Sequence, residues 1–166
     1  MVERLYVTGR VGLGFDVHPF SPDPDRRLVL AGVAIAGRGL TGHSDADVIA
    51  HAVADALLGA AGLGDLGSRF PDDDPRWEGA DSMQLLAGVV AEVRPSWRIG
   101  NVDCAVVLEA PRLAPHRSAM EARLTEVVGA PVGIKPKRAE GLGALGRAEG
   151  IACWAVAMVE RAGPGG

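Results

Sequence analysis

Three side chains of types that bind metal ions stand at spacings that ordinary secondary structure can bring to one point. Along residues 11–18, apolar side chains alternate with two glycines, Asp16 and His18, which is the period-two pattern of a β-strand. Side chains two apart on a strand point the same way, roughly 6.5–7 Å apart. With His51 they make a set of three ligands that leaves one position open, as in catalytic zinc sites, whereas structural zinc usually has four. The pattern therefore predicts a catalytic zinc.

His51 lies in a segment with helical periodicity. Ser44 followed by Asp47 resembles a capping box and predicts a helix over about 44–61. Asp47, His51 and Asp55 share the face opposite to the apolar one. Alone, that face favours a solvated histidine with two acidic partners. Combined with the strand, it favours His51 as a ligand, with Asp47 or Asp55 as the acceptor that orients an imidazole.

Length and composition predict one domain over residues 10–160, between an N-terminal extension at 1–9 and a flexible tail at 161–166. The net charge of −4 argues against a nucleic-acid partner. Cys104 and Cys153 stand in apolar segments and are interpreted as reduced core residues. We find no membrane-length apolar window and no leader pattern, so we expect no membrane association and a cytoplasmic location.

The remaining pattern predicts an α+β fold, a sandwich with helices on one face of a mostly antiparallel sheet. Further strands are expected at 28–35, 98–109, 132–137 and 151–160, and further helices at 82–93 and 115–128. The strand at 151–160 is apolar on both faces, so both need cover. A partner subunit is preferred for the second face, and loops of the same chain are the alternative. Three glycines at 37, 39 and 42 predict a mobile loop before His43.

One glycine-rich string is excluded as a dinucleotide site. Residues 141–146 match Gly-x-Gly-x-x-Gly, but that mechanism needs a preceding strand, a following helix and an acidic residue about 20 positions later. The segment instead leads into the last predicted strand.

Motifs along nearly the whole chain, from about Arg10 to Val159, resemble the 2-C-methyl-D-erythritol 2,4-cyclodiphosphate synthase family. They are Gly14–His18, Gly42–Asp47, Asp55–Ala60, Leu63–Gly67, Phe70–Pro75, Gly79–Ser82, Ala110–Arg112 with Pro115-His116, and Gly146–Ala152. The resemblance implies a homotrimer of ferredoxin-like subunits with active sites at the subunit boundaries. It also implies conversion of 4-diphosphocytidyl-2-C-methylerythritol 2-phosphate, a cytidine diphosphate substrate, to the cyclic diphosphate and CMP. Metal-assisted intramolecular phosphoryl transfer in non-mevalonate isoprenoid synthesis is the reaction expected.

The resemblance also implies roles for individual residues. Asp16, His18 and His51 match the zinc ligands, Glu140 matches the ligand of a second divalent ion (Mg²⁺ or Mn²⁺), and His43 matches a catalytic residue. The implied substrate-binding residues are Asp16, Val17, His18, His43, Ser44, Asp65, Leu66, Gly67, Phe70, Pro71, Asp72, Asp73, Asp74, Leu108, Glu109, Ala110, Pro111, Arg112, Leu113, Ala114, Lys137, Arg138, Ala139, Glu140 and Arg147. Within that set, residues 65–67 and 70–74 match the methylerythritol and 2-phosphate pocket, and residues 108–114 match the cytidine pocket.

Some of these positions have simpler interpretations. The acidic run at 72–74 also fits a solvated turn, and Arg147 with Glu149, which match residues of the threefold axis, also fit an ordinary loop ion pair.

Several residues depart from the family pattern. Lys137, Arg138 and Ala139 stand where the family commonly has threonines, one of them assigned to transition-state stabilisation. We predict that Arg138 acts catalytically by making charge-assisted contacts to the diphosphate. Ala144 stands where phenylalanine is frequent, and Asp73 replaces a threonine.

Two other functions fit the same residues. A zinc hydrolase would cleave the phosphoanhydride with water and release separate phosphates. A non-catalytic sensor of isoprenoid diphosphates would need a fourth protein ligand for a structural zinc, from His43 or His116. The cyclase is preferred, with the hydrolase second.

Overall fold

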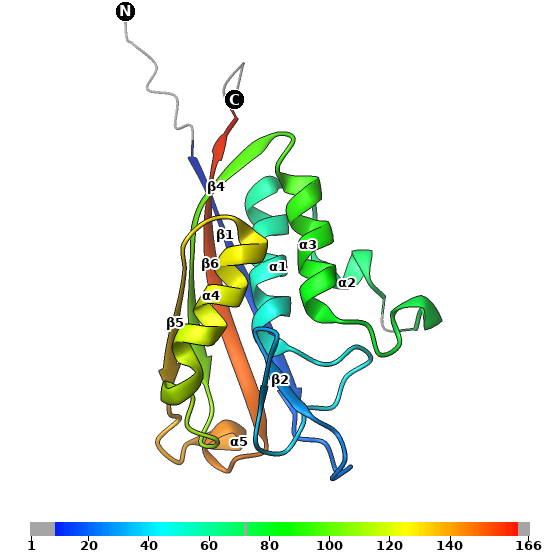
Figure 1. Cartoon of the computed structure of the whole chain (residues 1–166), viewed down its shortest axis with the longest axis vertical. Coiled ribbons are helices and arrows are strands. Elements are labelled where there is room, and N and C mark those ends of the chain that lie inside the picture. The colour runs from blue at the N-terminus through cyan, green and yellow to red at the C-terminus, as the bar shows by residue number, and fades with distance from the viewer. Residues whose placement is uncertain (1–8, 72, 163–166) are drawn as a thin grey trace, which may run out of the picture.

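A mixed sheet of four strands forms one layer of the molecule (Figure 1). The computed structural model describes residues 9–71 and 73–162, so Asp72 and most of the predicted extension and tail fall outside it. In spatial order the strands are β1 (Gly9–Pro19), β6 (Gly150–Arg161), β4 (Trp97–Val107) and β5 (Val132–Lys137). The β1–β6 and β6–β4 pairs are antiparallel and β4–β5 is parallel. The predicted α+β class with a mostly antiparallel sheet is confirmed.

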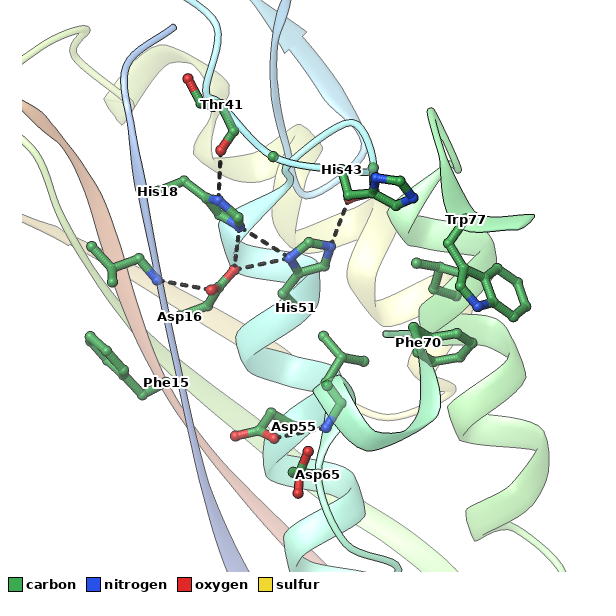
Figure 2. Close-up of a pocket in the computed structure, with 16 residues that line it drawn as sticks. Phe15, Asp16, His18, Thr41, His43, His51, Asp55, Asp65, Phe70 and Trp77 are labelled. Carbon is green, nitrogen blue, oxygen red and sulfur yellow. Dashed lines mark hydrogen bonds and ion pairs between the residues drawn. The ribbon is translucent and has the colours of Figure 1, made fainter. Parts of the chain in front are cut away.

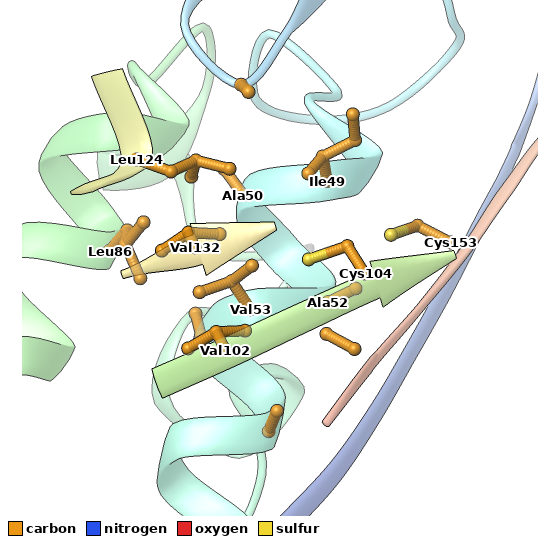
Figure 3. Packing of buried hydrophobic residues seen from close by; sticks show 14 of the residues in the cluster. Ile49, Ala50, Ala52, Val53, Leu86, Val102, Cys104, Leu124, Val132 and Cys153 are labelled. Carbon is orange, nitrogen blue, oxygen red and sulfur yellow. The ribbon is translucent and has the colours of Figure 1, made fainter. Parts of the chain in front are cut away.

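Helices cover one face of this sheet (Figure 1). The long helices are α1 (Val48–Ala61), α3 (Ser82–Val93) and α4 (Arg117–Val128), and the short helices are α2 (Leu66–Arg69), η1 (Pro75–Trp77), η2 (Ala114–His116) and α5 (Gly143–Gly146). Figure 3 shows the apolar core between α1, the neighbouring helices and the sheet. Cys104 and Cys153 are buried there as free thiols, as predicted.

Two glycines decide which face of β1 meets the helix layer. A Cβ on Gly12 or Gly14 would lie 2.0 Å from a backbone carbonyl oxygen of α1, so only glycine permits this approach. The face that carries Asp16 therefore lies against α1. The alternate face is exposed, with Val11 at 68% and Leu13 at 65%.

The last strand, β6, has the same two-sided character. Cys153, Ala155 and Ala157 are fully buried under the helices, whereas Trp154 is 38% and Val156 is 42% exposed. Within the described ranges, loops of the same chain leave this outer face of β1 and β6 open to solvent. Among the described residues, the alternative that such loops cover the second apolar face of β6 therefore does not hold at Trp154 and Val156.

The segment predicted as one strand at 28–35 is a hairpin. It consists of β2 (Leu28–Leu30) and β3 (Val33–Ile35). The chain reverses at Ala31 and Gly32, which have φ of 51° and 69°. A backbone in this left-handed region cannot continue an extended strand, and this explains the difference from the prediction.

The predicted capping box is also corrected. Helix α1 begins at Val48, and its N-cap is Asp47, which accepts hydrogen bonds from the backbone N–H groups of Ile49 and Ala50. Asp47 is fully buried and also accepts from Ala31 N at 2.8 Å and Gly32 N at 2.7 Å. It joins the hairpin turn to the helix terminus, so its predicted role as the acceptor for an imidazole is wrong.

Candidate metal centre and pocket

Three donor atoms converge where the end of β1 meets the first turns of α1 (Figure 2). Asp16 Oδ2 lies 2.9 Å from both His18 Nε2 and His51 Nδ1. The two nitrogens are 3.4 Å apart. Metal–ligand bonds of about 2.0–2.1 Å in tetrahedral geometry would place ligand atoms about 3.3 Å apart. The donor set predicted from the sequence therefore forms within one chain, and its spacing suits a zinc-sized ion.

A backbone carbonyl fixes the direction of the His18 ring. His18 Nδ1 lies 2.8 Å from the carbonyl oxygen of Thr41. A carbonyl can only accept, so Nδ1 carries the proton and Nε2 presents its lone pair to Asp16. Outward hydrogen bonds of this kind orient metal-binding imidazoles.

The His51 ring is oriented by a serine and an aspartate. Ser82 Oγ, 2.8 Å from His51 Nε2, donates its proton to the carboxylate of Asp45. The serine oxygen must therefore accept from Nε2–H, which leaves Nδ1 with a lone pair. Three lone pairs of Asp16, His18 and His51 then face one point, and a cation is the natural partner for that arrangement.

The same contacts act on the Asp16 carboxyl. Burial raises the pKa of this carboxyl, but the hydrogen bonds and charge that the His18 and His51 rings supply when they are protonated outweigh burial and hold the pKa well below its usual range. Asp16 is therefore an anionic donor at neutral pH.

A pocket of about 510 Å³ opens beside the donor set (Figure 2). Its lining includes these residues from the predicted site: Asp16, Val17, His18, His43, Ser44, His51, Asp65, Leu66, Gly67 and Phe70. Asp55 also lines it but accepts from Leu66 N at 3.2 Å, so its alternative role in orienting an imidazole is wrong. Phe70 and Trp77 stack edge to face with ring centres 4.9 Å apart and close the pocket on the side of α2 and η1.

Two further predicted residues hold the pocket loops. The ring of His43 donates from Nε2 to the carbonyl oxygen of Asp74 at 3.0 Å. The Asp74 carboxylate caps η1 and binds the Arg76 guanidinium, with Nε 2.9 Å from Oδ2. These contacts fit the alternative interpretation of 73–74 as a turn. Pro71 and Asp73 are not among the lining residues.

The other predicted residues lie apart from this pocket, beyond the ends of β4 and β5. Glu109 Oε2 accepts from Arg138 Nε at 3.0 Å and Nη2 at 2.8 Å, and its Oε1 accepts from Ala139 N. The Arg138 contact holds the pKa of the Glu109 carboxyl below its usual range. Glu140 follows in left-handed backbone geometry, φ 54°. We call residues 108–114 and 137–140 the second cluster.

Arg147 lies near this end of the sheet and pairs with Glu149 at 2.6 Å. Both side chains are more than half exposed, which is the ordinary loop ion pair that the sequence left open.

Sequence reasoning missed the residues that orient the two imidazoles. Thr41 acts through its carbonyl group, which no side-chain pattern reveals. Ser82 is 31 positions from His51 and 37 from Asp45. In the sequence Ser82 is only the first residue of the helix predicted over 82–93, which Asp81 caps.

Comparisons with known proteins agree with these observations. The YgbB family matches residues 9–160. The chain is 52% identical over 163 residues to a 2-C-methyl-D-erythritol 2,4-cyclodiphosphate synthase from Bordetella petrii, covering 95% of this chain and 99% of the relative. It is 50% identical over 155 residues to a bifunctional enzyme IspD/IspF from Anaeromyxobacter dehalogenans, covering 91% of this chain but only 40% of that relative.

A solved structure, a CDP complex of IspF from Plasmodium falciparum, superposes with a TM-score of 0.82 at 29% identity, over 95% of this chain and 99% of that one. Within residues 9–71 and 73–162, no helix has the length and hydropathy of a membrane span.

Proposed function

The chain belongs to the YgbB family, and we propose that it is a 2-C-methyl-D-erythritol 2,4-cyclodiphosphate synthase of isoprenoid biosynthesis. It converts 4-diphosphocytidyl-2-C-methyl-D-erythritol 2-phosphate to the cyclic diphosphate and CMP. The observation that carries the proposal is the convergence of Asp16, His18 and His51 at one wall of the 510 Å³ pocket. The bifunctional relative is much longer than this chain, so the proposal covers the cyclase reaction alone.

The reaction is an intramolecular phosphoryl transfer. An oxygen of the 2-phosphate forms a bond to the β-phosphorus of the diphosphate. The bond from that phosphorus to the bridging oxygen breaks, and its electron pair leaves with CMP. No nucleophilic side chain is needed, but the enzyme must fold a flexible anion back on itself. Such positioning can supply roughly 7–11 kcal/mol of a barrier.

Asp16, His18 and His51 would hold zinc, with a position left for a substrate phosphate. When bound, zinc would neutralise charge on the transferring phosphoryl group. The loop at His43 and Ser44 positions the phosphates. Asp65 and Phe70 bound the part of the pocket that receives the methylerythritol unit, where carboxylate oxygens can accept hydrogen bonds from sugar hydroxyls.

The second cluster is proposed to bind the cytidine and the diphosphate, with Glu140 as ligand of a second divalent ion, Mg²⁺ or Mn²⁺. Arg138 contacts the diphosphate in place of a threonine, and Arg147 lies nearby. Because β1 and β5 are the two outer strands of the sheet, we infer that the second cluster and the donor set of one chain do not form a single site.

A homotrimer of ferredoxin-like subunits would bring the two halves together at the subunit boundaries. Its support is the exposed apolar face of β1 and β6, which includes Val11, Leu13, Trp154 and Val156. Such a face is typical of an interface between copies of a chain. We place the enzyme, of the phosphorus–oxygen lyase class, in the cytoplasm.

Phosphorus NMR of the purified protein with the cytidyl substrate, zinc and Mg²⁺ tests this function. The expected result is a pair of coupled resonances from a cyclic diphosphate, appearing together with CMP. CMP with only linear phosphates would identify the hydrolase instead. Bound zinc without turnover would contradict both activities and favour the sensor.

A further inference from the structure

The loop of residues 40–44 joins the hairpin region to α1, and four of its residues, 41–44, line the pocket. Arg26, which lies outside the pocket lining, binds the carbonyl groups of alternate loop residues. Its Nε donates to Leu40 O at 3.1 Å, and its Nη2 donates to Gly42 O at 3.1 Å and to Ser44 O. One half-buried guanidinium thus binds three backbone carbonyl groups of a loop that forms one wall of the site.

The intervening carbonyl groups point to other partners. Thr41 O accepts from His18 Nδ1 at 2.8 Å, and His43 O accepts from Gly79 N at 2.8 Å. Every carbonyl group of the loop therefore has a partner, and Arg26 supplies the partner for three of the five. Backbone groups in a closed part of a protein need such partners.

Arginine suits this position for a chemical reason. Three carbonyl oxygens that face one point repel one another unless a donor lies between them. The guanidinium is planar, permanently charged and carries five N–H donors in fixed directions. The backbone of Arg26 adds to the same support, because its carbonyl oxygen accepts from Gly39 N at 3.1 Å.

We infer that Arg26 is a positioning residue of the candidate site. It holds the 40–44 loop so that the Thr41 carbonyl group meets His18, and so that His43 and Ser44 stand at the pocket wall. The effect on the loop rests on the contacts above. The effect on metal binding rests on the proposed function.

The neighbouring arginine provides a matched control. Arg27 is exposed, and its side chain forms no hydrogen bond with any residue in the described ranges. The same substitution at Arg27 changes the charge of the molecule equally, without touching the loop. Arg26→Lys tests whether a point charge can replace the planar group.

Hydrogen exchange of the full-length, metal-free chain by mass spectrometry tests the inference, with Arg26→Gln, Arg26→Lys and Arg27→Gln beside the wild type. The amides of Thr41 and Asp45 are bonded to Pro19 O and Ala80 O, so they report on the loop. In Arg26→Gln we expect exchange over 40–46 to rise about tenfold or more, while β4 and β6 stay protected. Arg26→Lys should be intermediate, and Arg27→Gln should match the wild type.

Zinc affinity of the same proteins, measured against a chromophoric chelator, gives the second readout. We expect Arg26→Gln to bind zinc about 10–100-fold more weakly, as when a contact behind a metal ligand is lost. Unchanged exchange over 40–46 in Arg26→Gln would overturn the inference. An equal rise throughout the molecule would overturn it too, since that is general destabilisation. A local rise with unchanged zinc affinity would contradict the link to His18. Because exchange needs neither metal nor turnover, failure of the cyclase assay leaves this test intact.

Discussion

The donor set (Asp16, His18 and His51) and the second cluster both lie at the C-terminal ends of strands, but their side chains are held in different ways. Strands β1, β4 and β5 all run in one direction, because β6 is antiparallel to both β1 and β4. Their C-terminal ends therefore share one edge. However, β1 and β5 are the two outer strands, about 14 Å apart at the usual strand spacing. This separation motivates the proposal that the two clusters meet across a boundary between subunits.

The two clusters also differ in how their side chains are held. At the donor set, His18 and His51 each have an outward partner that fixes the ring. In the second cluster, the Arg138 side chain is 61% exposed and pairs only with Glu109 among the described residues. The first region is preorganised by its own chain. The second presents charged groups outward, as expected of a surface that meets a ligand or another subunit.

The largest effect is expected from Asp16→Asn, which removes the anionic donor of the preorganised region. Zinc should be lost, and turnover should fall about a thousandfold or more, since metal ions supply several kcal/mol of charge stabilisation. Zinc content and phosphorus NMR measure the two quantities. Asp25→Asn, at an exposed position, is the control. Wild-type turnover in zinc-free Asp16→Asn would show that the donor set is not catalytic.

Ser82→Ala should produce the next largest effect. The variant removes the nearer of two hydroxyl groups beside His51 Nε2, the one that also donates to Asp45, and leaves Ser44 Oγ at 3.1 Å. We expect zinc affinity to fall about 10–100-fold, measured by chelator competition. Ser118→Ala on the exposed face of α4 should leave affinity unchanged. If Ser82→Ala binds zinc as the wild type does, Ser44 Oγ, which lies 3.1 Å from His51 Nε2, or packing is enough to hold the ring.

Arg138→Thr should separate the regions most clearly. If Arg138 binds the diphosphate, turnover should fall about tenfold, the order expected for one charge-assisted hydrogen bond, while zinc affinity stays at the wild-type value. Steady-state kinetics measures the turnover, and chelator competition measures the zinc affinity. Glu109→Gln tests the positioning of Arg138, and the double variant should show that the two effects are not additive. Unchanged kinetics in Arg138→Thr would rule out its proposed role.

The smallest effects, on the free energy of unfolding, are expected at two alanines in left-handed geometry, one before α1 and one before β6. Ala148 (φ 56°) is partly exposed, and Ala148→Gly should raise the free energy of unfolding by about 0.5–1 kcal/mol. Ala46 (φ 59°) is fully buried. At Ala46, the gain from placing glycine in left-handed geometry is offset by the loss of a buried methyl group, about 0.8 kcal/mol. Ala46→Gly should therefore leave the free energy of unfolding almost unchanged. Urea unfolding measures both, and equal gains would show that packing around Ala46 matters little.

These contrasts explain what could be predicted from the sequence. Asp16 and His18 follow from strand alternation, and His51 follows from helical periodicity, because each pattern is local. The pattern could not show which face of the strand is covered, although Gly12 and Gly14 carried that information through the absence of a Cβ. The hairpin at Ala31 was missed because a left-handed alanine has no local signature.

The partners of the site were less predictable for a different reason. Asp47 and Asp55 have the right helical spacing to orient His51, but they bond to backbone N–H groups of other segments. The actual supports, Ser82, the Thr41 carbonyl group and Arg26, reach the site through tertiary contacts. Residue spacing does not contain this information, and a carbonyl group is present at every position of the chain.

The central claim is that the donor set of one chain works with the second cluster of another, and subunit complementation tests it most directly. Asp16→Asn lacks a working donor set, and Glu140→Gln lacks a working second cluster, so each variant alone should be inactive. Co-expression of both in equal amounts should restore about one quarter of wild-type turnover, because about one boundary in four then combines two intact halves. Active Glu140→Gln alone, or no recovery in mixed oligomers that contain both chains, would contradict the claim.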